Sequence, residues 1–367
     1  MRAFEFVTEA EKPKVGRALQ HLEDLVIVDG SQGAMKAIGH LSALANDVSD
    51  VTLKWDGSPA VVFGRDDNGR FVLTDKSGFD AKGYDGRVTS GEALERMLLS
   101  RGKTEPDDAR RQYAARMRDI FDVFEAAVDP SLRGFFKGDL LYAAQPSVVD
   151  GNFEFTPNVV TYVIPTDSTL GQQIAKSRAG VVVHSFNDQP VKTPIKGIKT
   201  GELFAVGLTS VNHLPSIDQS KIDDLRAYAR ATGPAIDALL DDQRLVAEKM
   251  SDFKATLYKF VNQQVDTGDL TGLNKRFDNW VANSGLSGPK KARIQDYRAH
   301  HAKAFEALFS LLERIGQVKD DVVEQLDAQS EVGQRIGSSK GGEGYVKGDV
   351  KLVPRLRFTA ATRAKHA

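Results

Sequence analysis

The feature that most constrains the fold is a change of pattern along the 367-residue chain. Before residue 212, short runs of β-branched and aromatic residues stand between Gly, Pro and Asp, which is typical of strands. Apolar residues at three- and four-residue spacing then extend from Ile217 to about Gln334 and predict long helices. Strand-like runs return after residue 337. The sequence therefore predicts an α+β protein with a helical insertion in a sheet-forming unit.

The individual elements follow from the same patterns. The predicted strands are Val51–Leu53, Ala60–Phe63, Phe71–Leu73, Phe135–Phe136, Val159–Ile164, Gly180–Val183, Glu343–Lys347 and Asp349–Val353. The predicted helices are Val15–Leu25, Gly33–Ala45, about Glu105 to Val128, Ile222–Ala231, Pro234–Val265 and Lys290–Ile315. Gly337–Gly342 is predicted to be flexible. The expected boundaries are a core with a helical lead at 1–212, the insertion at 213–336, and core-completing strands at 337–367.

Composition limits the chemistry. The absence of cysteine excludes disulfides, cysteine nucleophiles and thiolate zinc sites, so a metal would be a hard cation such as Mg²⁺ held by oxygen. No apolar stretch approaches the ~20 residues of a membrane span, and Met1–Glu5 lacks the apolar core of a signal peptide. We therefore expect a cytoplasmic protein with no membrane partner.

The net charge of −1 argues against a protein covered in basic residues. Local patches are still present, since basic residues outnumber acids ten to six between Leu245 and Lys303. Any single lysine there is more simply explained as part of a solvated helix face. In the same region Trp280 is expected in a helical core, and His300-His301 on a solvated face.

The most informative motif is Lys54-Trp55-Asp56-Gly57, which follows one predicted strand and precedes another. A lysine at a strand end, beside an Asp-Gly turn, can act as a nucleophile. The alternative is a hairpin in which Asp-Gly forms the turn and the lysine is solvated. A short motif needs context. Glu343-Gly344-Tyr345-Val346, with Lys351 on the strand after it, supplies that context.

In this order the elements resemble the covalent nucleotidyltransferase superfamily of ATP-dependent nucleic-acid ligases and mRNA-capping enzymes. Residues 54–60 (K-W-D-G-S-P-A) and 351–355 (K-L-V-P-R) are most similar to RNA-ligase-like proteins of tailed bacteriophages. The resemblance implies a ligase-type nucleotidyltransferase core with antiparallel sheets. It also implies ATP and Mg²⁺ as cofactors, and RNA or DNA with 5′-phosphate and 3′-hydroxyl ends as the partner. A phage-encoded protein of this kind would work in the host cytoplasm.

The resemblance also implies residue roles. Lys54 would attack the α-phosphate of ATP, and Lys351 would favour the uncharged amine and stabilise the transition state. Glu343 would hold the metal. Asp139 is the candidate for the acidic strand that contacts ribose or metal. The alternative is Glu202, a closer literal match to G-E-L, but Asp139 follows a helix and precedes two strand runs, as the family requires.

Other residues are expected to bind the nucleotide. Phe186 is the first candidate for stacking on adenine and His184 the alternative. The remaining candidates are Asp56, Gly57, Lys76 and Arg355.

Two departures from the family stand out. Pro59 occupies a position where many family members have arginine, and only sixteen residues follow Lys351, too few for a C-terminal OB-fold. A separate accessory protein could replace that domain. The main prediction is an ATP-dependent polynucleotide ligase that works through a lysyl-AMP intermediate. The alternatives are another nucleotidyltransferase, of capping type or acting on something other than a nick, and a non-catalytic nucleic-acid-binding descendant.

Overall fold

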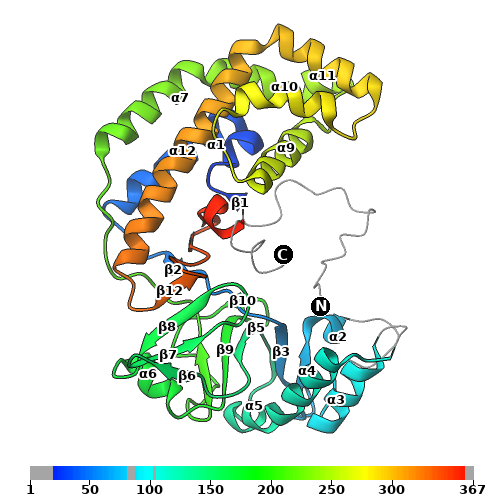
Figure 1. The fold of residues 1–367 in the computed structure, drawn as a ribbon, viewed down its shortest axis with the longest axis vertical. Helices are drawn as coiled ribbons and strands as arrows, with labels where there is room; N and C mark the ends of the chain where they lie inside the picture. The colour runs from blue at the N-terminus through cyan, green and yellow to red at the C-terminus, as the bar shows by residue number, and fades with distance from the viewer. Residues whose placement is uncertain (1–19, 81–86, 102–104, 360–367) are drawn as a thin grey trace. The chain divides into compact units, whose positions relative to one another are not determined.

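The computed structural model describes residues 20–80, 87–101 and 105–359. The contacts within the chain divide these residues into two units, which are described separately (Figure 1). The sheet unit comprises Leu53–Thr209 and Glu331–Gly342. The helical unit comprises residues 20–52, 210–330 and 343–359.

The larger sheet of the sheet unit has the order β10-β9-β5-β3-β4, with β11 beside β9. Its strands are β3 (Ala60–Arg65), β4 (Phe71–Asp75), β5 (Gly134–Tyr142), β9 (Ala179–Phe186), β10 (Gln189–Pro190) and β11 (Leu203–Val206). All of these pairs are antiparallel except β11 with β9. Each edge of β5 pairs with a neighbour, so its residues are held at the centre of the sheet.

Helices cover one face of this sheet (Figure 1). They are α3 (Gly91–Ser100), α4 (Asp108–Asp119) and α5 (Phe121–Ala127). The side chains of Ser90 and Asp107 cap the first two helices by accepting backbone N–H bonds. Phe63 and Phe136 of the sheet and Phe121 and Phe124 of α5 are buried in the shared core.

A second, antiparallel sheet in the same unit has the order β13-β12-β8-β7-β6. Its strands are β6 (Ser147–Val149), β7 (Asn152–Phe155), β8 (Thr161–Pro165), β12 (Gly333–Ile336) and β13 (Ser339–Lys340). The short helix α6 (Thr169–Ile174) packs on β7 and β8. Tyr142, at the end of β5, contacts the ring of Phe155 on β7, so side chains of the two sheets meet.

The helical unit is built around three long helices. They are α1 (Leu25–Leu44), α7 (Gln219–Leu240) and α12 (Ala302–Ala328), which pack on one another (Figure 1). The shorter helices are α8 (Asp242–Ala247), α9 (Phe253–Thr267), α10 (Leu273–Asn283) and α11 (Gly288–His300). Phe253, Phe260, Phe277, Phe305 and Phe309 are fully buried and form an aromatic core. None of the described helices is long and apolar enough to cross a membrane.

A small sheet accompanies these helices, with the order β1-β15-β14-β2. Its strands are β1 (Gln20–His21), β2 (Val51–Leu53), β14 (Tyr345–Lys347) and β15 (Val350–Leu352). β15 pairs parallel with β1 and antiparallel with β14. Thr52 and the residues before it belong to the helical unit, whereas Leu53 begins the sheet unit.

The mixed α+β class with mainly antiparallel sheets is confirmed, as are most of the predicted strands. Several details differ. Residues 20–21 form a strand, and α1 is bent at Asp29 and Gly30, where the backbone is not helical. The Pro234–Val265 pattern is divided among α7, α8 and α9. Gly337–Gly342 contributes to the β12–β13 hairpin. Residues 15–19 of the predicted first helix lie outside the described residues.

The unit boundaries also differ from the predicted ones. β12 and β13, in residues 331–342, return to the sheet unit, but β14 and β15 belong to the helical unit. The physical reason is pairing. β12 hydrogen-bonds to β8, whereas β15 pairs with β1, a strand that the helical pattern of residues 15–25 concealed.

Candidate functional site

The turn that contains Lys54 is fixed by the side chain of Asp56, which is 7% exposed. Its carboxylate accepts hydrogen bonds from Asn158 Nδ2 and the backbone N–H of Val159, both at 2.9 Å, and from Val160 N–H at 3.2 Å. These donors lie just before β8. Because both oxygens of Asp56 accept protein hydrogen bonds, this carboxylate positions the turn, and its contact with a nucleotide stays a prediction from the sequence.

Trp55 anchors the other side of Lys54. Its buried ring lies 4.6 Å from the ring of Tyr162, centroid to centroid, and its Nε1 donates to Thr209 Oγ1 at 3.0 Å. Tyr162 also accepts a hydrogen bond from the backbone N–H of Asp56 through its hydroxyl oxygen. The two residues that follow Lys54 are thus held by the sheet unit, while Lys54 itself is half-buried.

The second half of the motif docks on β5. Ser58 N–H donates to Leu140 O at 2.9 Å, and Leu140 N–H donates to Pro59 O at 3.0 Å. Gly57 passes so close to the strand that an added Cβ would lie 2.5 Å from Asp139 Cβ. Only glycine avoids this clash, which explains its presence without any contact to a ligand. The Lys54 turn and Asp139 are therefore neighbours.

Asp139 pairs with His184 on the adjacent strand β9. His184 Nε2 lies 2.8 Å from Asp139 Oδ2, and the two side chains are 44% and 25% exposed. Such a pair keeps a carboxylate and an imidazole available to a ligand. The alternative acid, Glu202, is exposed in the loop before β11 and pairs with Arg178 at 3.4 Å. Geometry thus associates Asp139, not Glu202, with the Lys54 turn.

The two candidates for base stacking are separated by a bulge in β9. Ser185 pairs with Lys137 and Val183 with Gly138, so His184 is the extra residue. Phe186, which is partly buried, consequently packs against the helix-covered core, and its ring lies 4.7 Å from that of Phe136. The choice of Phe186 as the stacking residue stays a prediction from the sequence. His184 is the aromatic residue beside Asp139.

Lys76 begins α2 (Lys76–Asp80), directly after β4, and is exposed. The residue before it, Asp75, pairs with Val61 of β3, the strand that follows the Lys54 turn. Asp75 is neutralised by Arg101, whose Nη2 lies 2.6 Å from Asp75 Oδ1. Lys76 therefore remains a candidate contact for a phosphate or ribose at this edge of the sheet.

Glu343 and Lys351 lie in the helical unit. The two predicted strands are confirmed and form a hairpin, with Val346 opposite Lys351, and the other edge of β15 pairs Lys351 with His21. Both Glu343 and Lys351 are half-buried. Their proposed roles as metal ligand and catalytic lysine stay predictions from the sequence.

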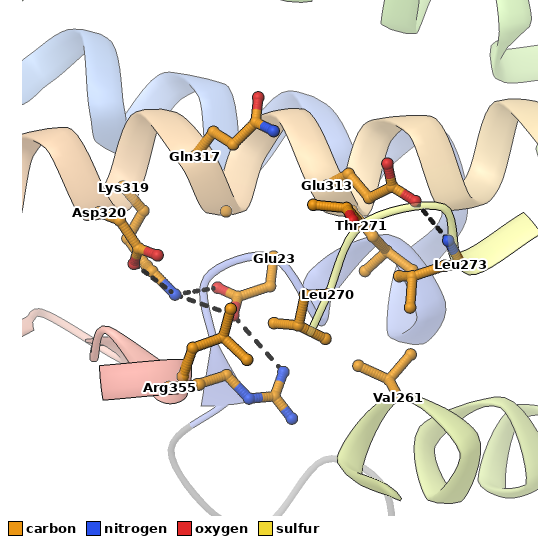
Figure 2. A pocket seen from close by; sticks show the side chains of 13 residues that line it. Glu23, Val261, Leu270, Thr271, Leu273, Glu313, Gln317, Lys319, Asp320 and Arg355 are labelled. Carbon is orange, nitrogen blue, oxygen red and sulfur yellow. Dashed lines mark hydrogen bonds and ion pairs between the residues drawn. The ribbon is translucent and has the colours of Figure 1, made fainter. Parts of the chain in front are cut away.

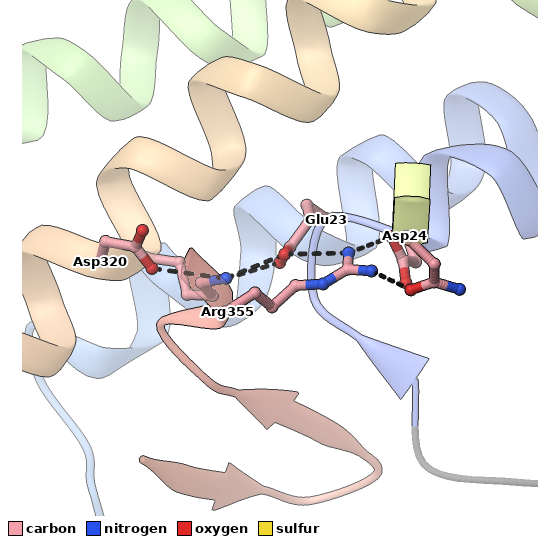
Figure 3. Close-up of polar contacts among 6 residues, drawn as sticks. Glu23, Asp24, Asp320 and Arg355 are labelled. Carbon is pink, nitrogen blue, oxygen red and sulfur yellow. Dashed lines mark hydrogen bonds and ion pairs between the residues drawn. The ribbon is translucent and has the colours of Figure 1, made fainter. Parts of the chain in front are cut away.

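Arg355, which was predicted to bind the nucleotide, is 4% exposed within an ion cluster of the helical unit. Its Nη1 lies 2.9 Å from Asp24 Oδ1 and 3.5 Å from Glu23 Oε1, and Nη2 donates to Asn262 (Figure 3). Lys319, 1% exposed, bonds to both oxygens of Glu23 at 2.9 and 3.0 Å. A guanidinium held this way stabilises the helical unit, and its contact with a nucleotide stays a prediction from the sequence.

The electrostatics of this cluster follow from burial and pairing. Burial would raise the pKa of Glu23, but Lys319 and Arg355 outweigh it and lower the pKa to about 2. Burial raises the pKa of Asp24 to about 6 against the attraction of Arg355. Burial, followed by the charge of Arg355, lowers the pKa of His21 to about 3. Sequence reasoning missed this cluster, since its members are far apart in the chain.

A cavity of about 90 Å³ borders the ion cluster (Figure 2). Its walls are partly apolar, from Val261, Leu270 and Leu273, and Glu23, Lys319 and Arg355 lie at one end. Pockets for nucleotide-sized ligands usually measure ~300–1,000 Å³. The cavity is therefore too small for ATP, and the turn around Lys54 is the better candidate for nucleotide chemistry.

Among the residues that the structure describes, no group of three His, Asp or Glu side chains gathers as a ready-made metal site. Mg²⁺ commonly takes only one or two carboxylates, with the remaining ligands coming from substrate phosphates and water. Asp139, beside the Lys54 turn, could supply one such carboxylate. The assignment of Asp139 and Glu343 as metal ligands stays a prediction from the sequence, and the two residues belong to different units.

Comparison with known proteins identifies the family. The model of DUF6267, a family of unknown function, matches residues 17–363, and the chain belongs to this family. A search of curated proteins and a search of solved structures each found no match.

Proposed function

We propose that the protein is an ATP-dependent polynucleotide ligase of the RNA-ligase-like type, built on a ligase-type nucleotidyltransferase core. One observation carries the proposal: the Lys54 turn docks on β5 at Asp139, and Asp139 pairs with His184. A candidate nucleophile, a carboxylate and an aromatic side chain thus come from one unit. A lysine can act as a nucleophile, and holding it beside groups that can bind a nucleotide favours attack on a phosphate.

In the proposed reaction, the Lys54 amine attacks the α-phosphorus of ATP, a nitrogen–phosphorus bond forms, and pyrophosphate leaves as the phosphoanhydride bond breaks. The amine proton passes to solvent. AMP is then transferred to a 5′-phosphate, and a 3′-hydroxyl displaces AMP to seal the strand. Bound Mg²⁺ would neutralise charge on the phosphates.

The protein's own groups have separate tasks in this scheme. Asp56 and Trp55 keep the backbone around Lys54 in one position, which limits the motion of the nucleophile. Asp139 would accept hydrogen bonds from the ribose or hold the metal ion. His184 would orient Asp139 and stack on the base.

Intact-mass spectrometry after incubation with ATP and Mg²⁺ tests the proposal. The wild-type protein should gain the mass of one AMP in an acid-labile adduct, whereas Lys54→Ala should not. Lys192→Ala is the matched control, because it removes an exposed lysine from the same unit. Adducts with GTP would favour the capping-type alternative. Absence of any adduct on the folded wild-type protein would favour the non-catalytic descendant and overturn the proposal.

Strand sealing is a second stage of the same test. RNA and DNA strands with 5′-phosphate and 3′-hydroxyl ends, nicked or free, are added to the AMP-loaded protein. Release of AMP together with a longer strand supports a ligase. Retention of AMP with all of these substrates would point to an adenylyltransferase that acts on something other than a polynucleotide end.

A further inference from the structure

A polar groove of about 480 Å³ lies in the helical unit, between α9, α10 and the segment that follows α10. Four amide side chains line it, among them Gln263, Asn279 and Asn283, together with Lys259 and Arg276. None of the described residues that line the groove is acidic, although acids are as common as bases in the chain as a whole. The lining therefore suits an anion with hydrogen-bonding groups.

An aromatic side chain belongs to the same groove. Trp280 is half-buried, with ring centroids 5.4 Å from Phe260 and 6.0 Å from Phe277. Its Nε1 donates to Gln263, one of the lining amides. The tryptophan was expected in a core, and its contacts with the two phenylalanines agree with that. Because it also lines the groove, the buried aromatic rings support it as a rigid platform.

The two cationic side chains that line the groove, Arg276 and Lys259, differ in whether a protein carboxylate already pairs with them. Arg276 is held by Asp269, with Nη1 3.1 Å from Oδ2, and by a bond to the backbone oxygen of Asp269 at 2.7 Å. Lys259 is exposed and forms no ion pair with the residues that the structure describes. Lys259 is thus the cation that can bind a phosphate, while Arg276 lines the groove and stays paired with Asp269.

We infer that this groove binds single-stranded polynucleotide, with a phosphate at Lys259, an unstacked base against Trp280, and base edges at the amides. Single strands are commonly held by a combination of cations and aromatic platforms. The inference names a contact surface for the polynucleotide substrate and so rests on the proposed function. A sugar or a protein ligand would not require a positive groove without carboxylates.

Fluorescence anisotropy with a fluorescein-labelled single-stranded oligouridylate, in the absence of ATP, tests the groove. Trp280→Ala should weaken binding roughly tenfold, and Trp280→Phe should restore part of the affinity. Lys259→Gln should weaken binding severalfold and reduce the slope of log K against log salt by about 0.7. Lys275→Gln removes the same charge from α10 outside the groove and should bind as the wild type does.

Three results would overturn the inference: no binding by the wild-type protein, wild-type affinity in both groove variants, or an equal loss in Lys275→Gln. Equal competition by a duplex of the same length would also overturn it, because paired bases cannot stack on Trp280. The binding measurement contains no ATP. Failure to form an AMP adduct would therefore not affect the result of the binding measurement. Failure to bind the strand would likewise not affect the result of the adduct assay.

Discussion

His184 Nε2 lies 2.8 Å from Asp139 Oδ2, across neighbouring strands and directly beside the turn that carries Lys54. The contact depends on the β-bulge at His184, which keeps the imidazole next to Asp139 while Phe186 packs against the core. A single extra residue in one strand therefore decides which aromatic side chain accompanies the candidate nucleophile.

The Asp139–His184 pair gives the first prediction. Asp139→Asn should slow formation of the Lys54–AMP adduct at least ~10-fold, because it removes the charge that would hold ribose or metal. Asp139 is partly exposed, so we expect the melting temperature to stay close to that of the wild type. Asp188→Asn, which removes a more exposed carboxylate from an ion pair with Lys137 on the same strand, is the control. An unchanged adduct rate in Asp139→Asn would remove Asp139 from the site.

Gly57 gives a second prediction, on the docking of the motif. In Gly57→Ala the new Cβ would lie 2.5 Å from Asp139 Cβ and 3.1 Å from Leu140 O, so the turn has to move away from β5. We expect a loss of about 1–3 kcal/mol in the free energy of unfolding, together with loss of the adduct. Urea denaturation measures the first effect. Gly201→Ala, where no atom lies within 4 Å of the new Cβ, should change neither quantity.

Substitution of Arg355 distinguishes a role in stability from a role in nucleotide binding. Arg355→Met leaves Asp24 buried without its partner, and we expect the helical unit to lose about 3–5 kcal/mol of stability. Arg357→Met breaks the pair with Asp327 at a site where the arginine side chain is 27% exposed, and should cost less. Urea unfolding followed by circular dichroism measures both. A stable Arg355→Met protein that fails to bind ATP would restore the nucleotide-binding prediction.

The partly buried His21 should make the free energy of unfolding depend on pH. Its pKa in the folded protein is lowered from 6.5 to about 3, mainly by burial and by Arg355, with Lys319 and Lys351 adding to the effect and Glu23 opposing it. The unfolded chain therefore takes up the proton first as the pH falls. The contribution of neutral His21 to stability is complete above pH 6.5 and is lost progressively between pH 6.5 and 3.

Replacement of His21 isolates this effect. Between pH 7 and pH 5, the wild-type protein should lose about 2 kcal/mol more unfolding free energy than His21→Gln. Glu23 and Asp24 titrate in both proteins and largely cancel in the difference. Urea titrations at the two pH values provide the measurement. Parallel stability losses in the two proteins would show that His21 is accessible to protons in the folded state.

Local patterns were sufficient to predict many elements. The β-branched runs of β4, β8 and β9 and the two short strands β14 and β15 could be predicted because strand propensity and turn residues act within a few positions. The helix near residues 105–128 was predicted as one and is two, since α4 ends at Asp119 and α5 begins at Phe121. The boundaries of such elements depend on packing that a local pattern does not contain.

The sequence by itself determined the order of the motifs and the strand end at Lys54, because these depend on neighbours in the chain, whereas the close approach of Gly57 to Asp139 is a tertiary contact. Only the tertiary structure decided which partners the polar residues have. Asp56 accepts from residues 102 to 104 positions away, and Arg355 pairs with Asp24 across 331 positions. Burial makes an unpaired charge or amide costly, so side chains with the same local appearance acquire different roles when the chain folds.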